Sequence, residues 1–160
     1  MGQEVRSDKP AFVVFEPGDG QFRALLSVEG LFSIEEDPEG LLRQATTLYE
    51  RYVASMRDRM AELKALRASR ELTPARKIWR LGDDIFQLRE GLVRLCLQID
   101  DIYTHLVRDL EVKRKWLEKV VIFRRYVPSE KMIPEELNWG RCEKGTARVA
   151  KRLRDGLPPQ

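Results

Sequence analysis

From residue 41 onward, apolar residues recur at steps of three and four positions, the spacing that places side chains on one face of an α-helix. The first run predicts a helix over about residues 41–70. Thr73 and Pro74 then supply a cap and a residue suited to the first turn, so a second helix is predicted to begin near residue 74. Two long helices joined so briefly are expected to pack antiparallel. The first apolar run comprises Leu42, Ala45, Tyr49, Tyr52, Met56, Met60, Leu63 and Leu66.

The second helical run has a seam with heptad spacing. A further apolar stripe lies beside the seam, and a face this wide indicates a helix that touches two neighbours in a bundle. The seam consists of Ile78, Leu81, Ile85, Leu88, Leu92, Leu95, Ile99, Ile102 and Leu106, and the adjacent stripe consists of Trp79, Phe86, Val93 and Tyr103.

The sequence alone does not fix the length of this second helix. An unbroken helix over 74–126 would extend roughly 80 Å at 1.5 Å per residue. Polar residues take the seam positions near 108–112. Either the helix continues past its partner there or it breaks, and we favour a break or bend.

Before residue 36 the pattern is one of short apolar runs. Residues 11–16 and 21–28 flank the sequence Pro-Gly-Asp-Gly, a strong turn signal because glycine accepts positive φ. We therefore predict a β-hairpin over 11–35, with 31–35 as a candidate third strand. An exposed hairpin edge is itself a surface for pairing with another chain.

The sequence thus predicts a mainly α fold, a three- or four-helix bundle with one long central helix and a small N-terminal β-hairpin. The predicted segments are a flexible N-terminus at 1–10, the hairpin at 11–35, the helical bundle at 36–126, a connector at 127–140, a basic amphipathic helix at 141–156 and a tail at 157–160.

Charge is unevenly spread along the chain. The net charge is +3, but residues 1–111 carry 16 Lys and Arg against 20 Asp and Glu, whereas residues 112–160 carry 13 against 6. A basic segment on a mildly acidic body indicates an anionic partner. On a single helix, the basic residues of 141–152 would share an arc of about 100°, a stripe suited to backbone phosphates.

These patterns support two functions. The first is a non-enzymatic nucleic-acid-binding accessory protein, for DNA or RNA, acting through the basic C-terminal segment. The second is a protein–protein adaptor or homo-oligomeric structural subunit, which would use the seam at 78–106 and the hairpin edge. Its basic charge would suit an acidic protein partner. The predicted nucleic-acid contacts are Arg141, Lys144, Arg148, Lys151, Arg152, Lys113, Lys115, Arg124 and Arg125, and the predicted protein interface is Trp79, Phe86, Val93 and Tyr103.

Two Asp-Asp pairs raise the question of metal or proton chemistry. The pairs Asp83-Asp84 and Asp100-Asp101 are separated by about 25 Å on a continuous helix, so they could not share a metal. Their heptad positions are mostly outward. We therefore interpret both pairs as solvent-facing charge, unless the chain folds back between them.

No residue pattern indicates an enzyme, a metal or a cofactor. His105 is the only histidine, and neither Cys96 nor Cys142 belongs to a Cys-x-x-Cys or Cys/His cluster. The two distant cysteines favour a reducing, cytoplasmic location. No apolar run approaches the length that spans a bilayer, so no membrane partner is expected.

Overall fold

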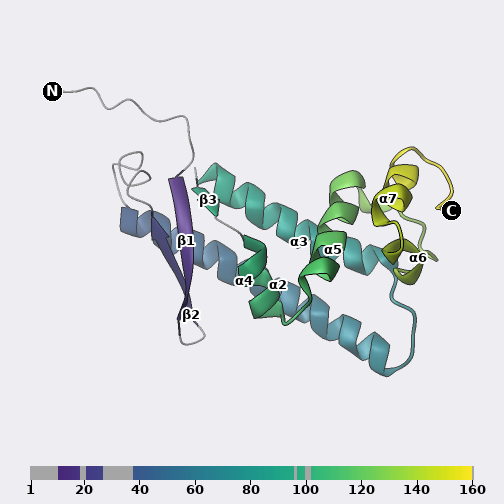
Figure 1. The fold of residues 1–160 in the computed structure, drawn as a ribbon, viewed down its shortest axis with the longest axis horizontal. Coiled ribbons are helices and arrows are strands. Elements are labelled where there is room, and N and C mark those ends of the chain that lie inside the picture. Colours follow the sequence, from purple (N-terminus) through teal and green to yellow (C-terminus); the bar gives the residue numbers. More distant parts are fainter. Residues whose placement is uncertain (1–10, 19–20, 27–37, 96, 100–101, 160) are drawn as a thin grey trace.

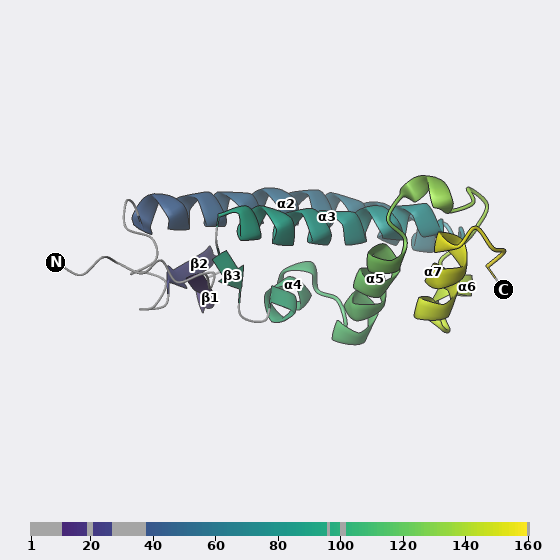
Figure 2. The same ribbon diagram turned by 90° about the horizontal axis from the view of Figure 1, so that it is seen from above.

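The computed structural model describes residues 11–18, 21–26, 38–95, 97–99 and 102–159. The fold is mainly helical and has two layers (Figures 1 and 2). One layer is a long antiparallel helical hairpin. The other layer consists of shorter helices, which lie on one side of this hairpin and follow one another along its length.

The long hairpin consists of α2 (Pro38–Ala68) and α3 (Ala75–Arg94). The helix α2 ends where Arg70 adopts a positive φ of 58° and the Glu71 amide donates to the Leu66 carbonyl oxygen. This pattern closes a helix C-terminus by satisfying a carbonyl that has no helical partner. The apolar positions of the hairpin form the core, which includes Ala45, Tyr49, Val53, Met56, Ile78, Leu81, Ile85, Leu88 and Leu92.

The second layer begins with α4 (Ile102–Leu110) and α5 (Arg114–Tyr126). Both helices cross the long hairpin (Figure 1). Glu111 separates them with a positive φ of 53°, and the Val112 amide donates to the Val107 carbonyl oxygen. The apolar face of α5 is buried through Leu117, Val120 and Phe123.

The break or bend favoured near 108–112 is present, because α4 ends at Leu110 and α5 begins at Arg114. An earlier interruption was not predicted. Helix α3 ends at Arg94, ahead of the strand β3 (Leu97–Ile99), so the chain stops being helical before it reaches 108–112. An extended strand cannot continue the helical hydrogen-bond ladder. The seam residues Ile102 and Leu106 are nevertheless buried, because α4 returns beneath the hairpin and brings them to the same core.

The basic helix predicted at 141–156 is also not continuous. The structure has α6 (Gly140–Glu143) and α7 (Thr146–Arg154), separated by Gly145 with a φ of 82°. That left-handed backbone angle interrupts the helix and is one that glycine adopts without strain. At the far end, Gly156 has a φ of 73° and the Leu157 amide donates to the Arg152 carbonyl oxygen, which closes α7.

The strands β1 (Ala11–Gly18) and β2 (Gln21–Leu26) join β3 in a sheet of order β2-β1-β3. The pair β1–β2 is antiparallel and the pair β1–β3 is parallel. Residues 19–20 and 27–37 lie outside the described residues. The hairpin predicted over 11–35, with its turn and third strand, therefore stays a prediction.

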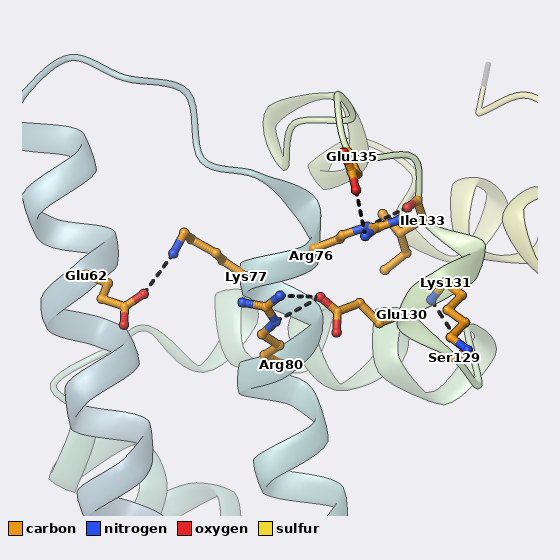
Figure 3. Close-up of polar contacts among 9 residues, drawn as sticks. All are labelled: Glu62, Arg76, Lys77, Arg80, Ser129, Glu130, Lys131, Ile133 and Glu135. Atoms are coloured by element: carbon orange, nitrogen blue, oxygen red, sulfur yellow. Dashed lines mark hydrogen bonds and ion pairs between the residues drawn. The ribbon is translucent and has the colours of Figure 1, made fainter.

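Polar contacts with the first turns of α3 hold the predicted connector, which contains the 3-10 helix η1 (Glu130–Met132), in place (Figure 3). Arg76 Nε donates to the Ile133 carbonyl oxygen at 2.7 Å, and Arg80 Nη2 lies 2.7 Å from Glu130 Oε1. Trp79 Nε1 donates to the Val127 carbonyl oxygen at 2.7 Å. These contacts hold the segment against the first turns of α3.

The same end of α3 is also linked to α2. Lys77 Nζ lies 2.8 Å from Glu62 Oε2 (Figure 3). This hydrogen bond, followed by the charge of the ammonium group, holds the pKa of the Glu62 carboxyl below its usual range. Glu62 is exposed, so the pair contributes little to stability.

Candidate binding groove between α3 and α5

Helices α3 and α5 approach closely because α3 carries a glycine at their crossing. Gly82 is buried. A Cβ atom on it would lie 2.7 Å from Arg124 Cβ and 2.9 Å from the Val120 carbonyl oxygen. Only a residue without a side chain permits this approach of two backbones. The crossing fixes α5 against α3 and leaves a groove between their outer faces.

The groove encloses a volume of about 280 Å³. Pockets for small organic ligands range from about 300 to 1,000 Å³. This groove is therefore of a size that accepts one or two side chains more readily than a whole cofactor. It is lined by Gly82, Ile85, Phe86, Arg89, Glu90, Val93, Val121, Arg124 and Arg125.

Arg124 forms an inner wall of the groove. Its guanidinium carbon lies 4.2 Å from the centroid of the Phe86 ring and 5.0 Å from that of Trp79. Its Nε donates to Asp83 Oδ1 at 2.9 Å, and the side chain is only 11% exposed. A planar cation held between rings and a carboxylate is rigid, and its charge is already compensated.

Arg89 of α3 lies at the rim of the groove, where a residue of another helix holds its side chain. Its Nη1 donates to the Tyr103 hydroxyl at 2.8 Å, and its guanidinium carbon lies 5.8 Å from the centroid of that ring. Tyr103 belongs to α4, so a third helix positions a side chain that lines the groove. Because the partner is a neutral hydroxyl, the positive charge of Arg89 is not compensated by this contact.

Two large apolar side chains of the groove remain exposed to solvent. Phe86 is 40% exposed and Val93 is 62% exposed. They stand seven positions apart on α3, which places them two turns apart on one face. An exposed apolar pair beside cationic side chains differs from the ordinary polar outer face of a helix.

The structure brings together residues that the sequence assigned to two different surfaces. Phe86 and Val93 were predicted as protein contacts, whereas Arg124 and Arg125 were predicted as nucleic-acid contacts, and all four line one groove. The two remaining members of the predicted protein interface, Trp79 and Tyr103, act behind it by contacting Arg124 and Arg89.

Other predicted basic residues lie elsewhere. Lys113 and Lys115 are exposed at the start of α5, about 15 Å along the helix from Arg124 and Arg125. In the C-terminal region, Lys151 Nζ lies 5.0 Å from the Tyr126 ring centroid and Arg152 Nε donates to the Pro158 carbonyl oxygen at 2.6 Å. The predicted residues Arg141, Lys144, Arg148 and Lys151 are exposed, and Arg152 is half-buried.

The predicted single basic stripe is therefore wrong as a geometric unit. It assumed one helix over 141–156, but Gly145 interrupts the helix between Arg141 on α6 and Arg148 on α7. Arg124 was also predicted to bind phosphate, but its guanidinium group pairs with Asp83 and packs against two aromatic rings.

Sequence reasoning missed Arg89, Glu90, Val121 and Gly82 as groove residues. The signal for Arg89 and Glu90 was present, because they lie between Phe86 and Val93 on the same helix face. No signal identified Val121, since its placement depends on where α5 crosses α3. The same holds for Gly82, whose place at the crossing depends on the close approach of Val120 and Arg124.

Asp83 and Asp84 were interpreted as solvent-facing charges unless the chain folds back between the two Asp-Asp pairs. The chain does fold back after Arg94, and the interpretation is wrong. Asp84 is 7% exposed, and its Oδ2 accepts hydrogen bonds from Arg59 Nε at 2.7 Å and from Ser55 at 3.0 Å. Asp83 pairs with Arg124 across the opposite interface. Helix α3 lies between α2 and α5. Positions that would face water on a lone helix therefore contact a neighbouring helix on each side. Asp100 and Asp101 lie outside the described residues.

Two reactive side chains are placed unfavourably for catalysis. His105 is 8% exposed on the inner face of α4. Cys142 is buried, and burial raises the pKa of its thiol to about 11, so it is protonated at neutral pH. Within the described residues, no three His, Cys, Asp or Glu side chains gather in a way that could hold a metal ion.

No helix in the described part of the chain is long and apolar enough to cross a bilayer. Comparisons of the chain with protein families, with curated proteins and with solved structures found no match.

Proposed function

We propose that this protein is a protein-binding adaptor, and that the groove between α3 and α5 receives a segment of a partner protein. The observation that carries the proposal is the exposed pair Phe86 and Val93 inside a groove whose remaining walls are rigid. Burying apolar side chains releases water and stabilises a complex by about 25 cal/mol per Å² of apolar surface.

The construction of the groove supports binding of a segment. Arg124 is held between Trp79, Phe86 and Asp83, and Arg89 is held by Tyr103. Side chains that are fixed before binding lose little entropy when the partner arrives. Aromatic and arginine side chains of this kind are also enriched among residues that dominate binding energy at interfaces.

The proposal is tested by selection of displayed random peptides on the immobilised protein. A parallel selection uses Val93→Asp, which places a charge on a largely exposed groove residue. We expect peptides that are enriched on the wild type and lost on the variant. Enrichment of no peptide, or of peptides that bind both proteins equally, would remove the groove as a protein-binding site.

A matched control is available in Leu72→Asp. Leu72 is 75% exposed in the segment between α2 and α3, outside the groove lining. The exchange introduces the same charge in place of an apolar residue, so the selected peptides should bind it as they bind the wild type. Phe86→Asp gives a second, independent groove variant, and far-ultraviolet circular dichroism checks that each variant is folded.

We also retain nucleic-acid binding as a second candidate function, at a surface other than the groove. It is supported by four exposed basic residues near the C-terminus, Arg141, Lys144, Arg148 and Lys151, in a segment whose net charge is positive. Such charges bind phosphates with little dependence on base sequence, and four contacts to duplex give a log–log salt slope of about −3.6.

Titration of labelled single-stranded and duplex DNA and RNA, across a salt series, tests this second candidate. Arg148→Glu with Lys151→Glu should weaken binding and flatten the salt dependence. The control is Arg43→Glu with Lys64→Glu, which makes the same charge change on exposed positions of α2. If both double variants lose the same amount of nucleic-acid affinity, binding depends on overall charge alone, and a specific C-terminal site is excluded.

A further inference from the structure

We propose that the partner segment is an amphipathic α-helix that lies along α3, with apolar residues seven positions apart on Phe86 and Val93 and with carboxylates facing Arg89 and Arg125. The inference rests on the proposed protein-binding function and specifies its ligand. It combines the spacing of the apolar pair, the charge of the rim and the size of the groove.

The spacing of the apolar pair matches a helix. Phe86 and Val93 are separated by two turns of α3, about 10.5 Å at 1.5 Å per residue. A second helix laid alongside presents its own positions i and i+7 at the same interval, so both contacts form without distortion. An extended segment covers this distance in about three residues, and its side chains alternate between faces.

The charge of the rim selects an acidic helix. Among the described residues, Arg125 is exposed and forms no ion pair, while Arg89 contacts the neutral hydroxyl and ring of Tyr103. Arg124 is compensated by Asp83. Glu90 is the single acidic residue of the lining. The groove therefore presents an excess of positive charge, and a partner with carboxylates beside its apolar positions complements it.

The apolar content of the groove disfavours a phosphate backbone as its occupant. Phe86, Val93 and Val121 offer surface that gains from contact with aliphatic side chains. The phosphate oxygens of a nucleic acid have no apolar group to place there. A volume of about 280 Å³ fits one or two Leu-sized side chains, so the anchors enter and the body of the helix stays outside.

Arg125 is the specificity-determining residue in this arrangement. It stands one turn from Val121 on α5 and is the exposed arginine on that wall of the groove. A guanidinium group binds a carboxylate through two parallel hydrogen bonds, which an ammonium group cannot reproduce. Reversal of its charge should therefore change which segments bind without changing the apolar contact.

The sequences of the peptides selected on the wild type, and lost on Val93→Asp, test the inference. We expect apolar residues seven apart, flanked by Asp or Glu, and helical circular dichroism in the bound peptide. Arg125→Glu should weaken the binding of an acidic peptide at least tenfold in fluorescence anisotropy titrations. Replacing the acidic residues of the peptide with Lys should restore binding to that variant. Lys64→Glu, on α2, should have little effect.

Some outcomes would overturn the proposal of an acidic helix and leave the adaptor function in place. These are selected peptides whose binding depends on Val93 but which are basic, or which lack helical spacing. Failure to select any peptide that depends on Val93 overturns both. Displacement of a selected acidic peptide by duplex DNA at low salt, with the same dependence on Val93, assigns the groove to nucleic acid and also overturns the inference.

Discussion

The Asp83 carboxylate accepts a hydrogen bond from Arg124 at 2.9 Å, and this contact joins α3 to α5. The neighbouring residue Asp84 turns to the other side and joins α3 to α2 through Arg59 and Ser55. Adjacent helical residues point about 100° apart, so one Asp-Asp pair reaches two different helices. The pair thus stabilises the three-helix packing that holds the groove open.

Replacement of Asp84 should destabilise the fold. Asp84→Asn keeps the shape but removes the charge that Arg59 faces, and hydrogen bonds to charged groups contribute about 1.5–3 kcal/mol. We expect the free energy of unfolding in urea to fall by about that amount. Asp58→Asn serves as the control because Asp58 is exposed on α2. Equal stability of the two variants would show that Asp84 contributes no more than surface charge.

The two glycines of α3 should respond oppositely to alanine. In Gly82→Ala the new methyl group meets Arg124 Cβ and the Val120 backbone oxygen, which cannot move without shifting α5. We expect a loss of about 1–3 kcal/mol, typical of overpacking. In Gly91→Ala the closest atom is Leu48 Cδ2, the end of a flexible side chain, so the gain in helix propensity, up to about 1 kcal/mol, should prevail.

Thermal unfolding of both glycine variants checks this contrast. The pair is its own control, because the same exchange is made on the same helix nine positions apart. Stabilisation by Gly82→Ala would contradict the close crossing on which the groove depends.

Cys142 should make stability fall at alkaline pH. Burial raises the pKa of its thiol from 9.0 to about 11. A group with a raised pKa in the fold stabilises it below the unfolded value, and that contribution is lost as pH rises through the folded value. The free energy of unfolding should therefore decline between pH 9.0 and about 11. In Cys142→Ala this part of the decline should be absent, whatever the variant's stability at neutral pH.

Tyr49 adds a similar effect above its ordinary pKa of 10.0. Burial raises the pKa of its phenol, and the hydrogen bond it donates to Asp109 raises it further. The neutral phenol is thus favoured in the fold, so its contribution is present below pH 10.0 and is lost above it. In Tyr49→Phe the fall of the free energy of unfolding above pH 10.0 should be smaller. Because the lost hydrogen bond has a charged acceptor, the exchange should cost about 1.5–3 kcal/mol at neutral pH. Tyr52→Phe, on the same helix and half-buried, is the control for removing a phenol hydroxyl.

The helical character of the chain followed from its apolar spacing. The run from Ala45 to Leu63 predicted the buried face of α2, and the run from Ile78 to Leu92 predicted that of α3. These faces are local properties, since a 3.6-residue period places them on one side of a helix in any packing. The seam also predicted that Ile102 and Leu106 are buried, although it assigned them to the wrong helix.

The sequence by itself determined which side chains are apolar on each helical face and where basic charge accumulates. Only the tertiary structure decided where the chain turns back after Arg94, how Gly145 divides the C-terminal basic segment, and which partners Asp83 and Asp84 reach. Helical periodicity reports neighbours within a few residues along the chain. Pairing between α3 and α5 depends on contacts about 40 residues apart in sequence, and these are set by packing of the whole core.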